Sequence, residues 1–166
     1  MKRYCKTIAA ATLSVLAVAA CQKENLGGAQ DGREVDVNLT LTSPEIGTKA
    51  YGDGTTVNTV HVYVYQVAAD GAMTYIAPAS GEAATPTQEV SMTGGTAKYS
   101  THLVTGQKYT FVFWADYHKD GYTSPYSYDS ASQTIAVNYT DAAGNDENRD
   151  AFYNVLKDVE ITGAYS

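Results

Sequence analysis

The most reactive side chain of this 166-residue sequence is the thiol of Cys21, which follows an apolar run. Basic residues stand at positions 2, 3 and 6, and residues 8–20 (IAAATLSVLAVAA) are almost entirely apolar. This order is typical of a secretory signal peptide. The run is shorter than the roughly 20 residues that cross a bilayer as a helix. We therefore expect export, with residues 1–20 cleaved off between Ala20 and Cys21.

The residues before the cysteine predict what the thiol reacts with. Val18, Ala19, Ala20 and Cys21 resemble the bacterial lipobox, in which one aliphatic and two small residues precede a cysteine that receives lipid. The other cysteine, Cys5, lies in the segment to be removed, so the mature chain has no internal disulfide. A catalytic thiol needs a positioned histidine, and the sequence around Cys21 has none. We expect a covalent lipid on Cys21, and an unmodified cysteine is the alternative.

The histidines and serines form no pattern typical of an enzyme. His61, His102 and His118 lie on separate segments, and none belongs to a closely spaced pair or a Cys/His set of the kind that binds zinc. The serines lack a G-x-S-x-G context, and there is no glycine-rich phosphate loop. The sequence therefore predicts a protein that is not an enzyme and has no resident cofactor.

An acidic segment at residues 141–150 (DAAGNDENRD) contains oxygen ligands of the kind that calcium takes. These ligands are Asp141, Asn145, Asp146, Glu147 and Asp150. The segment lacks the D-x-[DN]-x-[DN]-G pattern of a calcium loop. A solvated acidic turn is the favoured interpretation, and calcium binding is the weaker one.

Aromatic side chains are concentrated after residue 113. Trp114, Tyr117, Tyr122, Tyr126 and Tyr128 flank turn signals at Asp120-Gly121 and Ser124-Pro125. Exposed aromatic rings on loops can stack on a sugar or on a partner protein. The favoured alternative is that these rings pack against a sheet and cover its edge.

The charge balance excludes a class of partner. Residues 21–166 contain eight basic and eighteen acidic residues, a net charge of −10. Nucleic-acid binding depends on clustered lysine and arginine, so we expect no nucleic-acid partner. Residues 21–33 are polar and glycine-rich, which favours a flexible tether, and residues 34–166 suit one domain.

That domain has the sequence pattern of short strands. Residues 34–42 alternate between apolar and polar side chains, whereas residues 57–67 are apolar or aromatic on both faces, as in a central strand. Asp70-Gly71 predicts a hairpin to residues 72–77. Further strands are expected at 88–92, 97–103, 108–116, 133–139 and 155–161, and one helical turn within 148–155. The expected fold is all-β: an antiparallel Greek-key β-sandwich with little or no helix.

The order of these elements resembles the fimbrillin-like surface lipoproteins of the Bacteroidota, which include type V pilus subunits and accessory proteins. The resemblance is carried by the lipobox signal, the tether, the alternating strand, Thr48-Lys49-Ala50, and the segments VNTVHVYVYQ (57–66), YTFVFWADY (109–117) and NRDAFYN (148–154). It implies a transthyretin-like sandwich whose first strand, here residues 35–41, is removed by a protease. A strand of the next subunit then fills the groove.

The resemblance also implies the processing sites and a location. Family members often have arginine where this chain has Lys49, and the nearby Arg33 precedes the strand, so cleavage there would trim only the tether. A second β-domain usually follows, so the chain is expected to be the N-terminal part of a longer protein. Gln22-Lys23-Glu24-Asn25 resembles the charged tag of surface-displayed lipoproteins, with an ordinary polar tether as the alternative.

Together these features predict a surface-exposed lipoprotein of the cell outer membrane. We expect a fimbrial subunit or accessory adhesin, assembled by strand exchange with other pilus subunits or contacting host surface ligands. One alternative is a ligand- or glycan-binding module that uses the aromatic loop and does not polymerise. Another is an inert structural domain of a larger lipoprotein.

Overall fold

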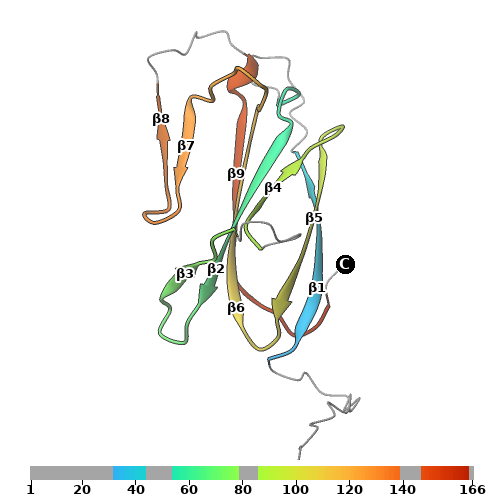
Figure 1. Ribbon diagram of the computed structural model, residues 1–166, viewed down its shortest axis with the longest axis vertical. Helices are drawn as coiled ribbons and strands as arrows, with labels where there is room; N and C mark the ends of the chain where they lie inside the picture. Colours follow the sequence, from blue (N-terminus) through green and yellow to red (C-terminus); the bar gives the residue numbers. More distant parts are fainter. Residues whose placement is uncertain (1–31, 44–53, 79–85, 139–146, 165–166) are drawn as a thin grey trace, which may run out of the picture.

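The computed structural model describes residues 32–43, 54–78, 86–138 and 147–164 (Figure 1). These residues form antiparallel strands and one short 3-10 turn, η1 (Glu147–Arg149). The expected all-β, antiparallel, sandwich-like fold is confirmed. Among the described residues no helix is both long and apolar enough to cross a membrane.

Most of the expected strands are present with nearly the expected bounds. In chain order they are β1 (Glu34–Thr42), β2 (Thr59–Val67), β3 (Met73–Tyr75), β4 (Gln88–Ser91), β5 (Thr96–Val104), β6 (Lys108–Asp116), β7 (Tyr126–Asp129), β8 (Thr134–Val137) and β9 (Ala151–Glu160). The strand expected at 108–116 is confirmed with both bounds, because its continuous apolar run is buried on both faces.

Within the described residues, the strands form three antiparallel sheets. The central sheet has the order β3-β2-β6-β9. β3 and β4 pair with the same edge of β2: β4 with residues 59–62 and β3 with residues 65–67. β1 and β5 form a two-stranded ribbon, and β7 and β8 form a hairpin. Figure 1 shows the β1–β5 ribbon on one side of the central sheet and the β7–β8 hairpin on the other.

The core lies between the central sheet and the β1–β5 ribbon. Val60, Val62 and Val64 of β2 are all buried, as the alternation along the strand requires. From the ribbon, Val35 and Val37 of β1 enter the same cluster. The face of the central sheet that contacts this cluster is called the inner face below.

One link between the two layers is a tight turn at Gly94-Gly95. Both glycines have positive φ angles, 58° and 73°, and the flanking Thr93 and Thr96 are bridged. Two consecutive residues at positive φ define the type I′ hairpin turn, which residues with a Cβ rarely adopt. The glycine pair therefore lets the chain leave β4 in one layer and enter β5 in the other.

The C-terminal third differs from the expectation. The tyrosine-rich stretch was expected to be loop, but residues 126–129 form β7, paired with β8. Strand β9 begins at Ala151, and the helical turn is limited to residues 147–149. The reason is the pairing with β6, in which Asp116 is opposite Ala151 and Phe113 is opposite Asn154. This pairing fixes residues 151–154 as strand although their local sequence is compatible with a helical turn.

Candidate functional site

The candidate site is on the outer face of the central sheet, which is turned away from the β1–β5 ribbon. Because Val60, Val62 and Val64 point inward, His61, Tyr63 and Tyr65 point outward. The register sets Trp114 opposite His61 and therefore on this same outer face. The β7–β8 hairpin covers part of the outer face.

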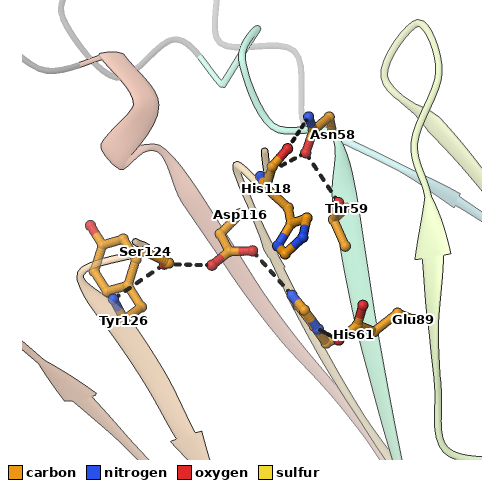
Figure 2. A network of polar contacts seen from close by, with 8 residues as sticks. All are labelled: Asn58, Thr59, His61, Glu89, Asp116, His118, Ser124 and Tyr126. Carbon is orange, nitrogen blue, oxygen red and sulfur yellow. Dashed lines mark hydrogen bonds and ion pairs between the residues drawn. The ribbon is translucent and has the colours of Figure 1, made fainter. Parts of the chain in front are cut away.

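Asp116, at the end of β6, is the centre of a polar network on this face (Figure 2). Its Oδ1 lies 3.1 Å from Nε2 of His61, and its Oδ2 accepts a 2.7 Å hydrogen bond from Oγ of Ser124. The backbone N–H of Tyr126 donates to the same Oγ over 3.2 Å. Asp116 is 5% exposed, so its charge depends on these partners. Burial opposes the charged form, but the hydrogen bonds from His61 and Ser124 outweigh it and lower the pKa of the carboxyl.

His61 lies between two carboxylates. Glu89 of β4 is directly opposite in the register, and its Oε1 is 3.3 Å from Nδ1 of His61. Burial disfavours the imidazolium, but the hydrogen bond and charge of Asp116 and the charge of Glu89 outweigh burial, so the pKa of His61 is raised. With both nitrogens facing acceptors, the doubly protonated ring satisfies both contacts.

The network has the residue types of a catalytic triad in a different order. In a triad the hydroxyl donates to the imidazole, which takes its proton. Here Ser124 donates to the carboxylate of Asp116, and both nitrogens of His61 contact carboxylates. His61 is therefore not positioned to accept a proton from Ser124. This geometry joins β2, β4, β6 and the segment before β7.

The other two histidines lie in different surroundings. His102 forms a 2.9 Å pair with Asp36 across β1 and β5, and both side chains are mostly exposed. The backbone of His118 exchanges two 2.8 Å hydrogen bonds with the side-chain amide of Asn58. The described part of the chain contains no group of three or more His, Cys, Asp or Glu that could hold a metal ion.

The aromatic residues singled out from the sequence pack in two groups. Trp114 is 8% exposed and contacts the ring of Tyr126 edge-on at 5.2 Å. The hydroxyls of Tyr122 and Tyr126 donate to the backbone carbonyls of residues 148 and 149, and Tyr117 packs on Tyr122 at 5.1 Å. This first group ties the segment before β7 to the η1 turn.

The second group surrounds Tyr128 of β7. Its ring lies 4.2 Å from that of Tyr63, and its hydroxyl hydrogen-bonds to that of Tyr65 over 2.8 Å. Tyr65 also donates to the carbonyl of Ser130. Tyr75 of β3 packs beside both β2 tyrosines. These contacts attach the hairpin to the outer face through tyrosine rings.

A cavity of about 290 Å³ opens next to this second group. It is lined by His61, Val62, Tyr63, Tyr75, Pro78, Thr87, Gln88 and Glu89. The cavity arises because β3 and β4 pair with different halves of the same edge of β2 and leave a notch between them. At the notch, the backbone groups of Val64 bond to partners outside the strands. Its N–H donates to Oγ1 of Thr87, and its carbonyl accepts from the N–H of Ile76.

Sequence reasoning missed Tyr63, Tyr75 and Glu89 as cavity residues. The alternation in residues 61–65 (HVYVY) does predict one polar and aromatic face. Nothing in the sequence predicts that two separate strands share one edge of β2.

The remaining sequence-predicted residues are placed as follows. Arg33 has an exposed side chain, and its backbone is hydrogen-bonded to Thr105. Asp150 accepts a 2.6 Å hydrogen bond from the backbone of Gly54, and Glu147 begins the η1 turn. Ala20, Cys21, Lys49 and three of the possible calcium ligands, Asp141, Asn145 and Asp146, lie outside the described residues.

Comparison with known proteins gives a family without an assigned activity. No curated protein and no solved structure matches the chain. One family model matches residues 29–165, which is most of the sequence. The chain belongs to this family, DUF6562, a family of unknown function.

Proposed function

We propose that this chain is a lipid-anchored surface domain of fimbrial or accessory-adhesin type that joins neighbouring subunits by exchange of its first strand. The export signal, the lipobox at Cys21 and the polar tether support anchoring at the outer membrane. The fimbrillin-like order of elements supports a role in surface assembly. The observation that carries the exchange step is the isolation of β1.

β1 is paired to the domain along one edge only. All nine of its residues are in antiparallel register with β5, and among the described residues it pairs with no other strand. Its inward side chains Val35 and Val37 are 7% and 2% exposed and complete the core. A strand with one partner and one apolar face can be replaced by an equivalent strand from another chain.

The burial free energy of β1 favours its replacement by another strand over its removal without replacement. Burial of a valine or leucine side chain contributes about 1.5–3 kcal/mol, and β1 supplies two buried valines and two half-buried leucines. A whole domain is stable by only about 5–15 kcal/mol. A chain that loses β1 would therefore expose an open core and must accept another strand to stay folded.

A disulfide lock tests the exchange step. Asn38 of β1 and Ser100 of β5 are exposed and directly opposite, and such pairs lie within disulfide distance. We expect the Asn38→Cys/Ser100→Cys chain, with Cys21→Ser, to stay monomeric after trypsin treatment when oxidised. When it is reduced, we expect N-terminal sequencing to show loss of β1 and electron microscopy to show polymers.

A matched control places the same disulfide elsewhere. Gln66→Cys/Thr74→Cys joins β2 to β3, at exposed and opposite positions that do not involve β1. This control should polymerise in both redox states. Polymerisation of the oxidised β1–β5 lock, or a stable monomer with intact β1 in every sample, would contradict strand exchange.

The anchor is tested separately. Cys21→Ser should release the protein from the membrane fraction, and protease shaving of intact cells should digest the unaltered protein. Survival of the unaltered protein on intact cells would contradict surface display.

The alternative glycan-binding function of the aromatic loop has less support. Trp114 is packed beneath Tyr126, and the hydroxyls of Tyr122 and Tyr126 are hydrogen-bonded to backbone carbonyls. These rings therefore offer little free surface for stacking.

A further inference from the structure

We propose that the notch between β3 and β4 is a binding site for an alkylammonium group. The site is the cavity of about 290 Å³ on the outer face, and it is independent of strand exchange. Its volume is at the lower end of the range for small-molecule sites, about 300–1,000 Å³. It therefore suits a small head group.

The walls provide aromatic faces. Tyr63 and Tyr75 are half-buried, and their ring centroids are 6.5 Å apart with planes inclined by 39°. Tyr128 packs against Tyr63 at 4.2 Å and restricts its movement. Tyrosine rings attract cations placed over their faces, so two inclined and restrained rings form part of a cage for an ammonium group.

The rim provides a carboxylate. The side chain of Glu89 is 67% exposed, and one of its oxygens contacts His61 at 3.3 Å. No hydrogen bond to a described residue is made by its other oxygen, which can therefore receive an N–H donor or neutralise a quaternary ammonium. An accessible carboxylate beside aromatic rings is the arrangement that recognises organic cations.

The electrostatics select a cation over an anion. No lysine or arginine is among the lining residues, and the one basic group, His61, already contacts two carboxylates. Burial raises the pKa of Tyr63 to about 12, and Tyr75 and the charge of Glu89 add to this effect. Of these causes, only the negative charge of Glu89 also favours a positive group in the cavity.

Choline and its neutral isostere 3,3-dimethylbutan-1-ol provide the main test, because they differ by one charge at nearly constant shape. We expect titration of the ¹⁵N-labelled mature chain with choline to shift the amide signals of residues 61–63 and 88–89. The neutral isostere should bind at least about ten-fold more weakly. Equal binding of the two compounds, or no binding of choline at 50 mM, would overturn the proposal.

Two variants test whether choline binds at the notch. Glu89→Gln keeps an oxygen for His61 and removes the charge, and Tyr75→Leu removes one wall from the exposed β3 strand. Each should weaken choline binding roughly ten-fold. The matched controls Asp36→Asn and Tyr153→Leu change an exposed carboxylate and an exposed tyrosine elsewhere, and they should bind as the unaltered chain does. Unchanged binding in Glu89→Gln would also overturn the proposal.

Two further arms distinguish the source of the ammonium group. A short peptide with one central lysine is compared with the same peptide acetylated on that lysine. Preference for the free lysine peptide over choline indicates a side chain of a partner protein, and the reverse preference indicates a small quaternary ammonium ligand. Tighter binding of methyl glucoside than of either cation would assign the site to sugars and refute the ammonium proposal.

Discussion

The two faces of the central sheet are built from the same strands but are stabilised in different ways. On the inner face, Val60, Val62 and Val64 pack on Phe111 and Phe113 without any polar contact between side chains. On the outer face, tyrosines and the His61–Asp116–Ser124 network attach a separate hairpin through hydrogen bonds of defined geometry. Apolar packing depends on volume, whereas hydrogen bonds depend on position. The inner face therefore supplies most of the stability, and the outer face fixes how β7–β8 and the cavity are arranged.

The largest expected effect is on the inner face. Phe111 is 1% exposed and contacts Tyr99 edge-on and Phe113 in a stacked arrangement. Phe111→Ala should lower the free energy of unfolding by about 3–5 kcal/mol, because it combines lost burial with a cavity. Urea denaturation measures this change. A decrease in the free energy of unfolding below about 1 kcal/mol would show that the core can close around the cavity left by Phe111. It would also argue against the inner face as the main source of stability.

The next largest effect is at the centre of the polar network. Asp116→Ala removes the acceptor for both His61 and Ser124 and should cost about 2–3 kcal/mol. Because Ser124 precedes β7, we also expect faster amide hydrogen exchange in β7–β8 but not in β1–β5. Asp116→Asn, which keeps two polar atoms, is the control and should cost less. Equal exchange changes in both regions would mean that the network stabilises the whole domain and not the outer face.

A smaller effect is expected from a single hydroxyl under the hairpin. Tyr65→Phe keeps the ring, which is 2% exposed, but removes the contacts to Tyr128 and to the carbonyl of Ser130. The expected loss is about 1–2 kcal/mol. Tyr99→Phe on the other side of the core removes the contacts of another buried hydroxyl, to the carbonyl of residue 86 and to the side chain of Thr101, and is the matched comparison. Only Tyr65→Phe should increase hydrogen exchange in β7–β8.

The smallest effect is the dependence of stability on pH. The pKa of His61 is raised, so its contribution is fully present below its ordinary value of 6.5 and is lost as pH rises through the higher folded-state value. The pKa of Asp116 is lowered from 3.8, so its contribution is present above that value and is lost as pH falls through the lower one. The two groups together favour maximal stability between about pH 4 and 6.5.

Melting temperatures between pH 5 and 8.5 measure this pH effect. The decrease above pH 6.5 should be absent in His61→Gln, which cannot titrate. An identical decrease in that variant would assign the pH dependence to titratable groups other than His61.

Much of the fold follows from local sequence patterns. The alternation in residues 34–42, the apolar run 108–116 and the hairpin signal at Asp70-Gly71 each predict their structure, because side-chain period and backbone freedom act within a few residues. β7 was missed because four residues of Tyr-Ser-Tyr-Asp between turn signals carry too little periodicity. The start of β9 was misplaced because its first residues form a strand only when paired with β6.

The candidate site was predictable only in part. The sequence left two interpretations of its aromatic stretch, exposed rings on a loop or rings packed against a sheet. In the structure the rings are packed, and they are those of Trp114, Tyr117, Tyr122, Tyr126 and Tyr128. Tyr122 and Tyr126 are held by the carbonyls of residues 148 and 149, and Tyr128 is held by tyrosines of β2. No local sequence pattern connects these partners.

The sequence by itself determined the apolar run that ends at Cys21, the acidic charge balance and the inward and outward sides of most strands, since each depends on residue type or short-range spacing. Only the tertiary structure decided that His61, Glu89, Asp116 and Ser124 converge and that β3 and β4 leave a notch at Tyr63. These features depend on strand register and on which edge each strand joins. Register is set by the packing of the whole core, so residues 55 positions apart become neighbours only after the chain has folded.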